Sequence, residues 1–170
     1  MKHKRWIFFV LALSMVFLFV SCGSSAGEET GEKEMKANEI IVHDFSGNEV
    51  NLVNGRPVYI KAWASWCPVC LAGMGELNEL SAEDNGFDIV SVVSPGEYGE
   101  MDEQDFIAWW NGLDYDNITV YFDEGAALFD ELGIRAFPTS AYYDSNGELV
   151  TTIIGHNDNN TIISTMADIE

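Results

Sequence analysis

The feature that most constrains the fold is an apolar strand that leads directly into a helix carrying two cysteines. Residues 57–64 are apolar apart from Lys61, a pattern typical of a strand buried on both faces of a sheet. Residues 67–83 follow with apolar or small residues at helical spacing. Pro68 stands at the start of this helix, where its missing N–H costs nothing. A strand buried in this way predicts an α/β domain with helices on both faces of its sheet.

The rest of the chain continues the alternation of strands and helices. Residues 40–52 predict a strand, a turn and a second strand, and the step Asn146-Gly147 predicts a second hairpin. The remaining elements are expected as strands over 88–93, 119–122, 139–143 and 149–154 and as helices over 102–110, 126–132 and 159–169. The sequence thus predicts one domain over residues 39–170, with a mixed central sheet flanked by helices, an N-terminal β-hairpin and a central α/β insertion.

The N-terminal segment predicts export. Three basic residues precede an apolar run of 15 residues over 6–20, with Ser14 as its one polar residue, shorter than the roughly 20 that span a bilayer as a helix. We therefore expect residues 1–21 to be a removed signal peptide. Phe19-Val20-Ser21-Cys22 resembles a bacterial lipobox, which makes Cys22 the expected site of lipidation. The alternative is an uncleaved hydrophobic anchor that ends at Cys22, and both place the domain outside the cytoplasm.

Composition separates a tether from the domain and excludes some partners. Residues 22–38 are mostly Ser, Gly, Glu and Lys and predict a flexible tether with a reach of about 20 Å. Loss of residues 1–21 removes three of eight basic residues and no acidic one, which changes the net charge from −20 to −23. Phosphate backbones and anionic lipids repel such a chain, so we expect no nucleic-acid partner and a membrane attachment through covalent lipid.

Cys67 and Cys70 predict thiol-disulfide exchange. The open N–H groups at a helix start stabilise a thiolate at Cys67, while Cys70 lies about one turn deeper on the same face. This arrangement suits an attack by Cys67 on a disulfide, followed by resolution of the mixed disulfide by Cys70. Three alternatives remain: half of a zinc site, a structural disulfide, or two buried cysteines. His43 and His156 show no paired ligand spacing, so no metal site is predicted.

Two segments resemble a known family. Residues 62–70, Ala-Trp-Ala-Ser-Trp-Cys-Pro-Val-Cys, are similar to the active-site segment of thioredoxin-like proteins of the TlpA/ResA group, and residues 133–139 resemble the segment with that family's cis-proline. The resemblance implies a thioredoxin fold and no dissociable cofactor. It also implies a cis bond between Phe137 and Pro138, with Pro138 against the Cys67 sulfur and the Phe137 backbone free to pair with a substrate chain. Trp66 is expected to shape the docking surface.

A narrower resemblance suggests partners. Residues 94–98, 105–115 and 122–123 are similar to the thioredoxin-like domain associated with extracytoplasmic methionine sulfoxide reductases. Together with the N-terminal segment, it implies a lipid-anchored reductase on the outer face of the cell membrane that takes electrons from a CcdA/DsbD-like membrane thiol donor. The electrons would pass to a methionine sulfoxide reductase or another disulfide-bearing envelope protein. The alternatives are an apocytochrome c reductase, a disulfide-forming oxidase and, in another class, a non-catalytic carrier of a soft metal such as Cu(I).

Two positions depart from the family pattern. Lys61 stands where cytosolic thioredoxins have a buried aspartate, and Gly73 stands where many TlpA/ResA-like proteins have a glutamate. By resemblance, the carboxylate that accepts the Cys70 proton is missing at both places. One hypothesis is that the Lys61 ammonium points toward the cysteines and lowers their pKa values. The interpretation we favour from sequence is that the stem of Lys61 packs while its ammonium group reaches solvent.

Overall fold

The computed structural model describes residues 39–169. The predicted signal peptide, Cys22, the tether over 22–38 and the final residue lie outside this range, so those assignments stay predictions. In the described part, no helix is both long and apolar enough to cross a membrane.

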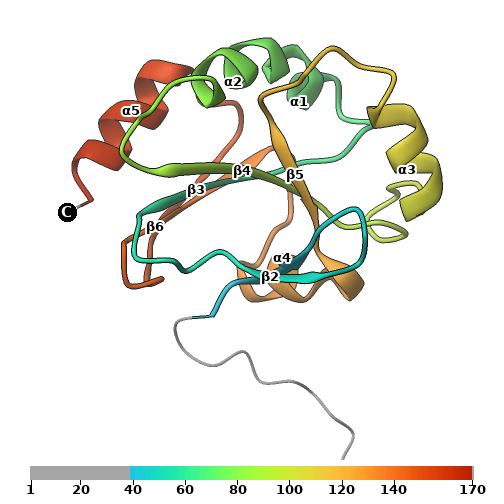
Figure 1. Cartoon of the computed structure of the whole chain (residues 1–170), viewed down its shortest axis with the longest axis horizontal. Coiled ribbons are helices and arrows are strands. Elements are labelled where there is room, and N and C mark those ends of the chain that lie inside the picture. The colour runs from blue at the N-terminus through green and yellow to red at the C-terminus, as the bar shows by residue number, and fades with distance from the viewer. Residues whose placement is uncertain (1–38, 170) are drawn as a thin grey trace, which may run out of the picture. The chain divides into compact units, whose positions relative to one another are not determined.

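A seven-stranded mixed sheet forms the centre of the domain, with strand order β2-β1-β5-β4-β3-β6-β7 (Figure 1). Strands β3 and β4 are parallel, as are β4 and β5, whereas β6 runs antiparallel to β3 and β7 antiparallel to β6. Strands β1 and β2 form the predicted N-terminal hairpin. The strands are β1 (Ile41–His43), β2 (Glu49–Asn51), β3 (Val58–Ala62), β4 (Asp88–Val93), β5 (Thr119–Phe122), β6 (Thr139–Tyr143) and β7 (Leu149–Ile154).

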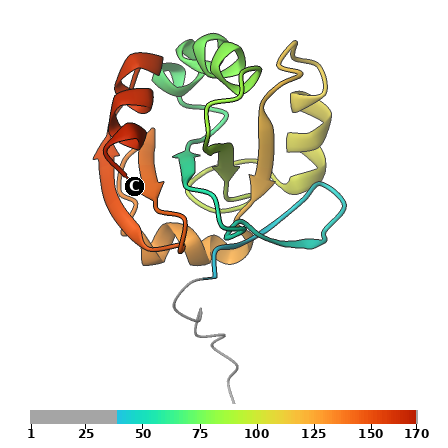
Figure 2. The ribbon, with the colours of Figure 1, turned by 60° about the vertical axis from the view of Figure 1, so that its left-hand side comes forward.

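Helices cover both faces of this sheet. In Figure 1, α1, α2 and α5 lie above the sheet and α4 lies below it, and Figure 2 shows the same layers from another side. Side chains from α1, α2, α3 and α5 share one buried cluster with Tyr59 and Trp63. Residues from α4 and from the N-terminal hairpin share the other with Val58 and Ile60. The helices are α1 (Pro68–Ala72), α2 (Met74–Ser81), α3 (Glu103–Trp110), α4 (Ala127–Glu131) and α5 (Asn159–Ala167).

The predicted helix over 67–83 is two helices that meet at Gly73. The backbone there has φ −94° and ψ 3°, which ends α1 and starts α2. The apolar positions keep their helical spacing through the junction, so the sequence pattern hides the break. Other boundaries agree with expectation to within a few residues, and Asp102 caps α3 by accepting a hydrogen bond from the Asp105 N–H at 2.9 Å. The α/β fold is therefore confirmed, and the single long helix is wrong.

Candidate active site

Cys67 and Cys70 form a disulfide at the start of the helix that follows the central strand. Strand β3 ends at Ala62, four residues follow, and Cys67 is the N-cap of α1, with its Cα 5.2 Å from that of Cys70. The Cys67 sulfur accepts a hydrogen bond from the Cys70 N–H at 3.2 Å. In the dithiol form the same N–H stabilises negative charge on that sulfur. Cys67 is 4% exposed and Cys70 is fully buried, so the expected contrast in accessibility is small in the disulfide form.

The peptide bond between Phe137 and Pro138 is cis, as the family resemblance implied. Pro138 directly precedes β6, and Thr139 of β6 pairs with Ala62 of β3. Because Ala62 is the last residue of the strand that leads to Cys67, the cis peptide and the disulfide lie at the same edge of the sheet. The carbonyl of Pro138 accepts a hydrogen bond from the Gly155 N–H at 2.8 Å, which ties this turn to the end of β7.

An exposed group of apolar side chains surrounds this edge. Trp66 is 53% exposed and Val69 is 55% exposed, and each is next to a cysteine in the chain. The Trp66 ring packs edge-on against Phe137, with ring centroids 5.9 Å apart, and Phe137 packs against Tyr98 at 5.8 Å. Exposed aromatic side chains around a buried disulfide form a surface on which another protein can dock. Trp66 is thus exposed beside Cys67, and its role in docking stays a prediction.

Comparison with known proteins agrees with this geometry. Residues 32–169 match the Redoxin family. The chain belongs to that family. An uncharacterised protein of Haemophilus influenzae is 44% identical over 121 residues, 69% of this chain and 78% of the other. Thiol-disulfide oxidoreductase ResA of Bacillus thuringiensis is 27% identical over 164 residues and covers 91% of both proteins. The crystal structure of the exposed lipoprotein thioredoxin of Streptococcus pneumoniae has a TM-score of 0.72 and 36% identity, over 76% of this chain and 98% of that chain.

This Redoxin protein is a thiol-disulfide oxidoreductase with a thioredoxin fold. The family match, the ResA-type relatives and the Cys67–Cys70 pair agree on this activity. Among residues 39–169, no group of three His, Cys, Asp or Glu side chains is placed to hold a metal ion.

Lys61 is buried on the cysteine side of β3, which contradicts the expectation that its ammonium reaches solvent. The residue is 3% exposed, and burial lowers the pKa of its amine to about 8, an effect that the Glu76 carboxylate opposes. A Cβ atom built on Gly73 would lie 3.4 Å from the Lys61 Nζ and 2.5 Å from the His156 Cε1. The His156 ring thus occupies the space that a side chain at position 73 would need, so a larger residue there would require the ring to move.

Glu100 is a buried residue of the site that the sequence did not reveal. Its carboxylate accepts hydrogen bonds from the N–H and the hydroxyl of Ser65, both at 2.5 Å, and from the Met101 N–H at 2.8 Å. These bonds fasten the loop after β4 to the residues just before Cys67. Glu100 thereby joins the loop that carries Tyr98 to the segment that carries Trp66. A lone glutamate in a loop has no sequence signal for this role.

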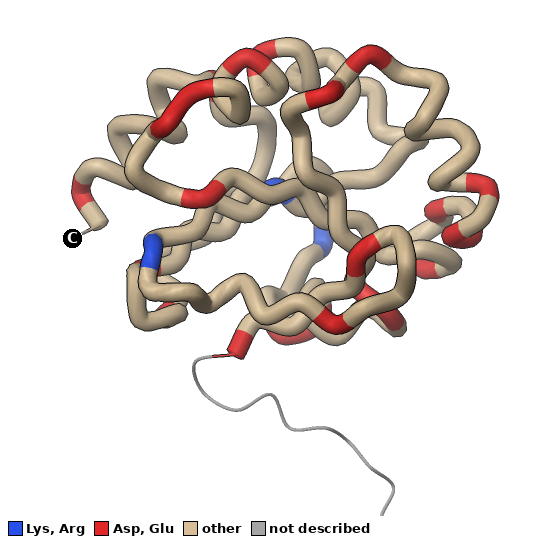
Figure 3. The backbone as a smooth tube through the Cα atoms, in the orientation of Figure 1, with Lys and Arg blue, Asp and Glu red and all other residues tan. Residues whose placement is uncertain are grey.

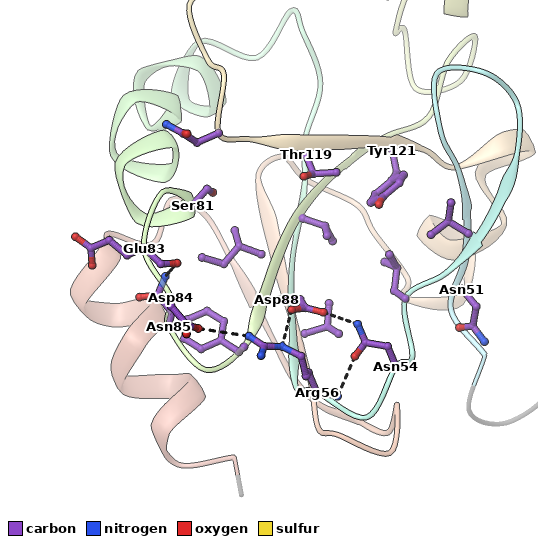
Figure 4. A pocket seen from close by; sticks show the side chains of 17 residues that line it. Asn51, Asn54, Arg56, Ser81, Glu83, Asp84, Asn85, Asp88, Thr119 and Tyr121 are labelled. Atoms are coloured by element: carbon purple, nitrogen blue, oxygen red, sulfur yellow. Dashed lines mark hydrogen bonds and ion pairs between the residues drawn. The ribbon is translucent and has the colours of Figure 1, made fainter.

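The pocket in Figure 4 lies at the opposite end of the sheet from the disulfide. It has a volume of about 370 Å³ and is lined by residues at the starts of β4 and β5 and by the segment before β3. Asp88 accepts hydrogen bonds from the Asn54 amide at 2.6 Å and from the Arg56 Nε at 2.8 Å. Neither cysteine lines this pocket, so it lies apart from the disulfide.

Proposed function

We propose that the protein is a disulfide reductase of the cell envelope. It takes electrons from a membrane thiol donor and passes them to envelope proteins, above all to a methionine sulfoxide reductase. The observation that carries this proposal is the Cys67–Cys70 pair beside the cis Phe137–Pro138 bond, under an exposed aromatic surface. A lipid on Cys22 would hold the domain at the outer face of the membrane, and similarity to an exposed lipoprotein thioredoxin supports that location.

The chemistry is a two-electron exchange between disulfides. In the reduced protein, the Cys67 thiolate attacks one sulfur of a substrate disulfide, and the other substrate sulfur leaves as a thiolate and takes up a proton. Cys70 then loses its proton and attacks the Cys67 sulfur, which breaks the mixed disulfide and releases the second substrate thiol. The substrate gains two electrons and two protons, and the protein is left with the Cys67–Cys70 disulfide that the structure contains. A membrane dithiol restores the reduced form by the reverse exchange.

The domain is strongly acidic, but the exposed side chains next to its cysteines are uncharged, so we expect partners to dock there through apolar contacts. Residues 39–169 contain 23 Asp and Glu against three Lys and Arg, and Figure 3 shows the acidic residues spread along the backbone of the helices and loops. Trp66 and Val69, each next to a cysteine in the chain, are exposed and uncharged. A partner with an apolar patch next to its disulfide, and with basic residues around that patch, suits this surface.

Trapping of the mixed disulfide tests the proposed partner. With Cys70→Ser, the intermediate on Cys67 cannot be resolved, so the attached envelope protein should be recovered under non-reducing conditions and released by reductant. Cys67→Ser is the matched control, because it keeps one cysteine of the pair and should trap nothing. Recovery of a methionine sulfoxide reductase supports the proposal, whereas recovery of an apocytochrome c alone contradicts it.

The reduction potential of the Cys67–Cys70 pair tests the direction. A potential near that of thioredoxin, about −270 mV, makes the dithiol a reductant of envelope disulfides, whereas one near −120 mV is that of an oxidant. Equilibration of the protein with glutathione buffers of known ratio, read by thiol labelling, measures it. A value at the oxidising end would reject the reductase direction while leaving thiol-disulfide exchange intact.

A further inference from the structure

Strand β3 points Lys61 toward the cysteines. Successive side chains of a strand alternate between its faces, so Lys61 shares a face with Tyr59 and Trp63. These two residues belong to the same buried cluster as Cys67 and Cys70. Lys61 is also the single lysine of residues 39–169, in a domain rich in carboxylates. The described part of the chain thus buries its one lysine in the layer between the sheet and the helix of the disulfide.

Gly73 leaves the space that the Lys61 amine reaches. Gly73 follows Cys70 by three residues, a separation at which helical positions share a side with Cβ atoms about 5–6 Å apart. The Lys61 Nζ lies 3.4 Å from the place of a Cβ on Gly73, so the amine sits directly under the end of α1.

His156 and Glu76 connect this buried space to solvent. The His156 Nδ1 lies 2.6 Å from the same Cβ place that the Lys61 Nζ approaches to 3.4 Å, and the His156 Nε2 lies 3.5 Å from a Glu76 carboxylate oxygen. The side chains of His156 and Glu76 are 33% and 53% exposed. The three groups form a series from the core to the surface, along which a proton can move.

The strands on both sides of Lys61 supply polar atoms. In the sheet register Lys61 lies between Ser91 of β4 and Ser140 of β6, and both serines are buried. The Ser140 hydroxyl is 3.0 Å from the Tyr59 hydroxyl, whereas the Ser91 hydroxyl has no hydrogen-bond partner among the described residues. The titratable and charged groups on the elements packed around Lys61 are Tyr59 of β3, Tyr142 of β6, Cys67 and Cys70 of α1, Glu76 of α2, and His156 and Asp158 of the segment before α5.

We propose that Lys61 is the base that removes the proton from Cys70 during resolution of the mixed disulfide, with His156 and Glu76 passing that proton to solvent. The inference rests on the proposed thiol-disulfide exchange and assigns its proton acceptor. The neutral Lys61 amine takes the proton from the Cys70 thiol, and the resulting thiolate forms the bond to the Cys67 sulfur. The bond from Cys67 to the substrate sulfur breaks, and the leaving substrate thiolate is protonated from solvent. During reduction of the protein by a dithiol, the Lys61 ammonium returns a proton to Cys70.

The acidity of Lys61 suits this exchange. Burial lowers the pKa of the amine to about 8. This value lies near the ordinary pKa of a cysteine thiol, about 8.5, which suits an amine that accepts a thiol proton and later returns it. At pH 7 an amine with a pKa of about 8 is neutral in about a tenth of the molecules, whereas a lysine at its usual pKa of 10.5 is almost fully protonated and rarely accepts a proton.

A two-phase reaction with 4,4′-dithiodipyridine separates the two steps. Full-length protein with Cys22→Ser as a common background is reduced and mixed with excess reagent in a stopped-flow instrument. Attack by Cys67 releases the first thiopyridone at a rate proportional to reagent concentration. Attack by Cys70 releases the second at a rate independent of it.

Lys61→Met should slow the second phase by about 10- to 100-fold at pH 7. The first phase should change far less, because Cys67 forms its thiolate at the helix start. Lys61→Arg keeps a cation that does not give up its proton, so it should slow the second phase equally. Arg56→Met, which removes a cation at the far end of the sheet, should leave both phases unchanged.

Two outcomes overturn the inference while the proposed function stands: an unchanged second phase in Lys61→Met, or a normal second phase in Lys61→Arg, which would mean that charge alone matters. Absence of the first phase in the parent protein would instead reject the proposed function.

A measurement on the unsubstituted Lys61 side chain tests the inference even if the Lys61 variants do not fold. In protein labelled with ¹⁵N-lysine, the pKa of the Lys61 amine should differ between the dithiol and the disulfide forms, because a base that exchanges protons with Cys70 is coupled to it. Lys61→Met identifies the resonance. Equal Lys61 titration curves in the two redox forms would refute the assignment.

Discussion

The two faces of β3 are equally buried but meet different surroundings. Val58, Ile60 and Ala62 point into the cluster with α4, which is mostly aliphatic, whereas Tyr59 and Lys61 point toward the helix of the disulfide. The first face contributes packing alone. The second carries an amine and stands opposite two cysteines, although an apolar residue in place of Lys61 would pack at lower cost. Burial alone therefore does not show whether a residue stabilises the fold or takes part in the reaction. The atoms around its side chain show this.

We call the face of β3 that carries Tyr59 and Lys61 the cysteine face, because it packs in the same cluster as Cys67 and Cys70. The largest expected effect comes from removing the Cys67 sulfur next to this face. Cys67→Ser should lower the rate of disulfide reduction at least about a thousandfold, because a hydroxyl without a base does not replace a thiolate as nucleophile. The measurement is reduction of a small aromatic disulfide in the Cys22→Ser background. The variant should still unfold cooperatively. A residual rate above a few per cent would show that Cys70 can begin the exchange.

The opposite face should respond in stability and not in rate. Ile60→Ala leaves a cavity in the cluster with α4 and should lower the free energy of unfolding by about 2–4 kcal/mol. Urea denaturation followed by tryptophan fluorescence gives this value. The rate of disulfide reduction in the absence of urea should stay within about twofold of the parent. A large loss of rate with a small loss of stability would mean that the two faces are not independent.

The cysteine face was more predictable from sequence than the groups that support it. The Cys67–Cys70 pair and the cis bond before Pro138 follow from short segments whose residues are adjacent in the chain. The position of the Lys61 amine depends instead on Gly73, which provides space, and on His156, which fills part of it from a distant loop. The alternation of a strand gives the face of Lys61 but not whether its long side chain finds a way to solvent.

Helix boundaries and loop contacts show the same limit. The break at Gly73 leaves the apolar spacing of the two helices unchanged, so a pattern of buried positions cannot reveal it. Glu100 acts through hydrogen bonds to Ser65, 35 residues earlier, and such polar contacts between loops have no periodicity. Local patterns thus predict the reacting atoms, while long-range contacts decide their surroundings.

Lys61→Met tests the contrast between the two faces of β3, because it replaces the amine on the cysteine face with an apolar side chain. Burial lowers the pKa of Lys61 from 10.5 to about 8 in the folded chain. The folded state therefore holds fewer protons than the unfolded state between these two pH values, and the stability of the parent rises with pH over this window. Below pH 8 the cost of burying the charge is fully present. The variant should be more stable by on the order of 2 kcal/mol at pH 7.

Urea denaturation of the disulfide forms at pH 7 and at pH 10 measures this difference. The advantage of Lys61→Met should shrink at the higher pH, because the parent amine loses its charge while groups shared by both proteins cancel. A parent that is as stable as the variant at pH 7 would mean that Glu76 compensates fully for burial of the ammonium.

The smallest expected changes in stability come from two buried serines, Ser91 within β4 and Ser94 directly after it. Ser94 donates a hydrogen bond from its hydroxyl to the Asp123 carbonyl at 2.8 Å, whereas the Ser91 hydroxyl on the cysteine face has no partner among the described residues. Ser94→Ala should therefore lower the free energy of unfolding by about 1 kcal/mol. Ser91→Ala should raise it by up to about 1 kcal/mol, because it removes a polar group that burial penalises. Parallel urea denaturation of the two disulfide-form variants at pH 7 measures both changes. Destabilisation by Ser91→Ala would reveal a partner for this hydroxyl, and the Lys61 amine of the neighbouring strand is then the group to test in a double-mutant cycle.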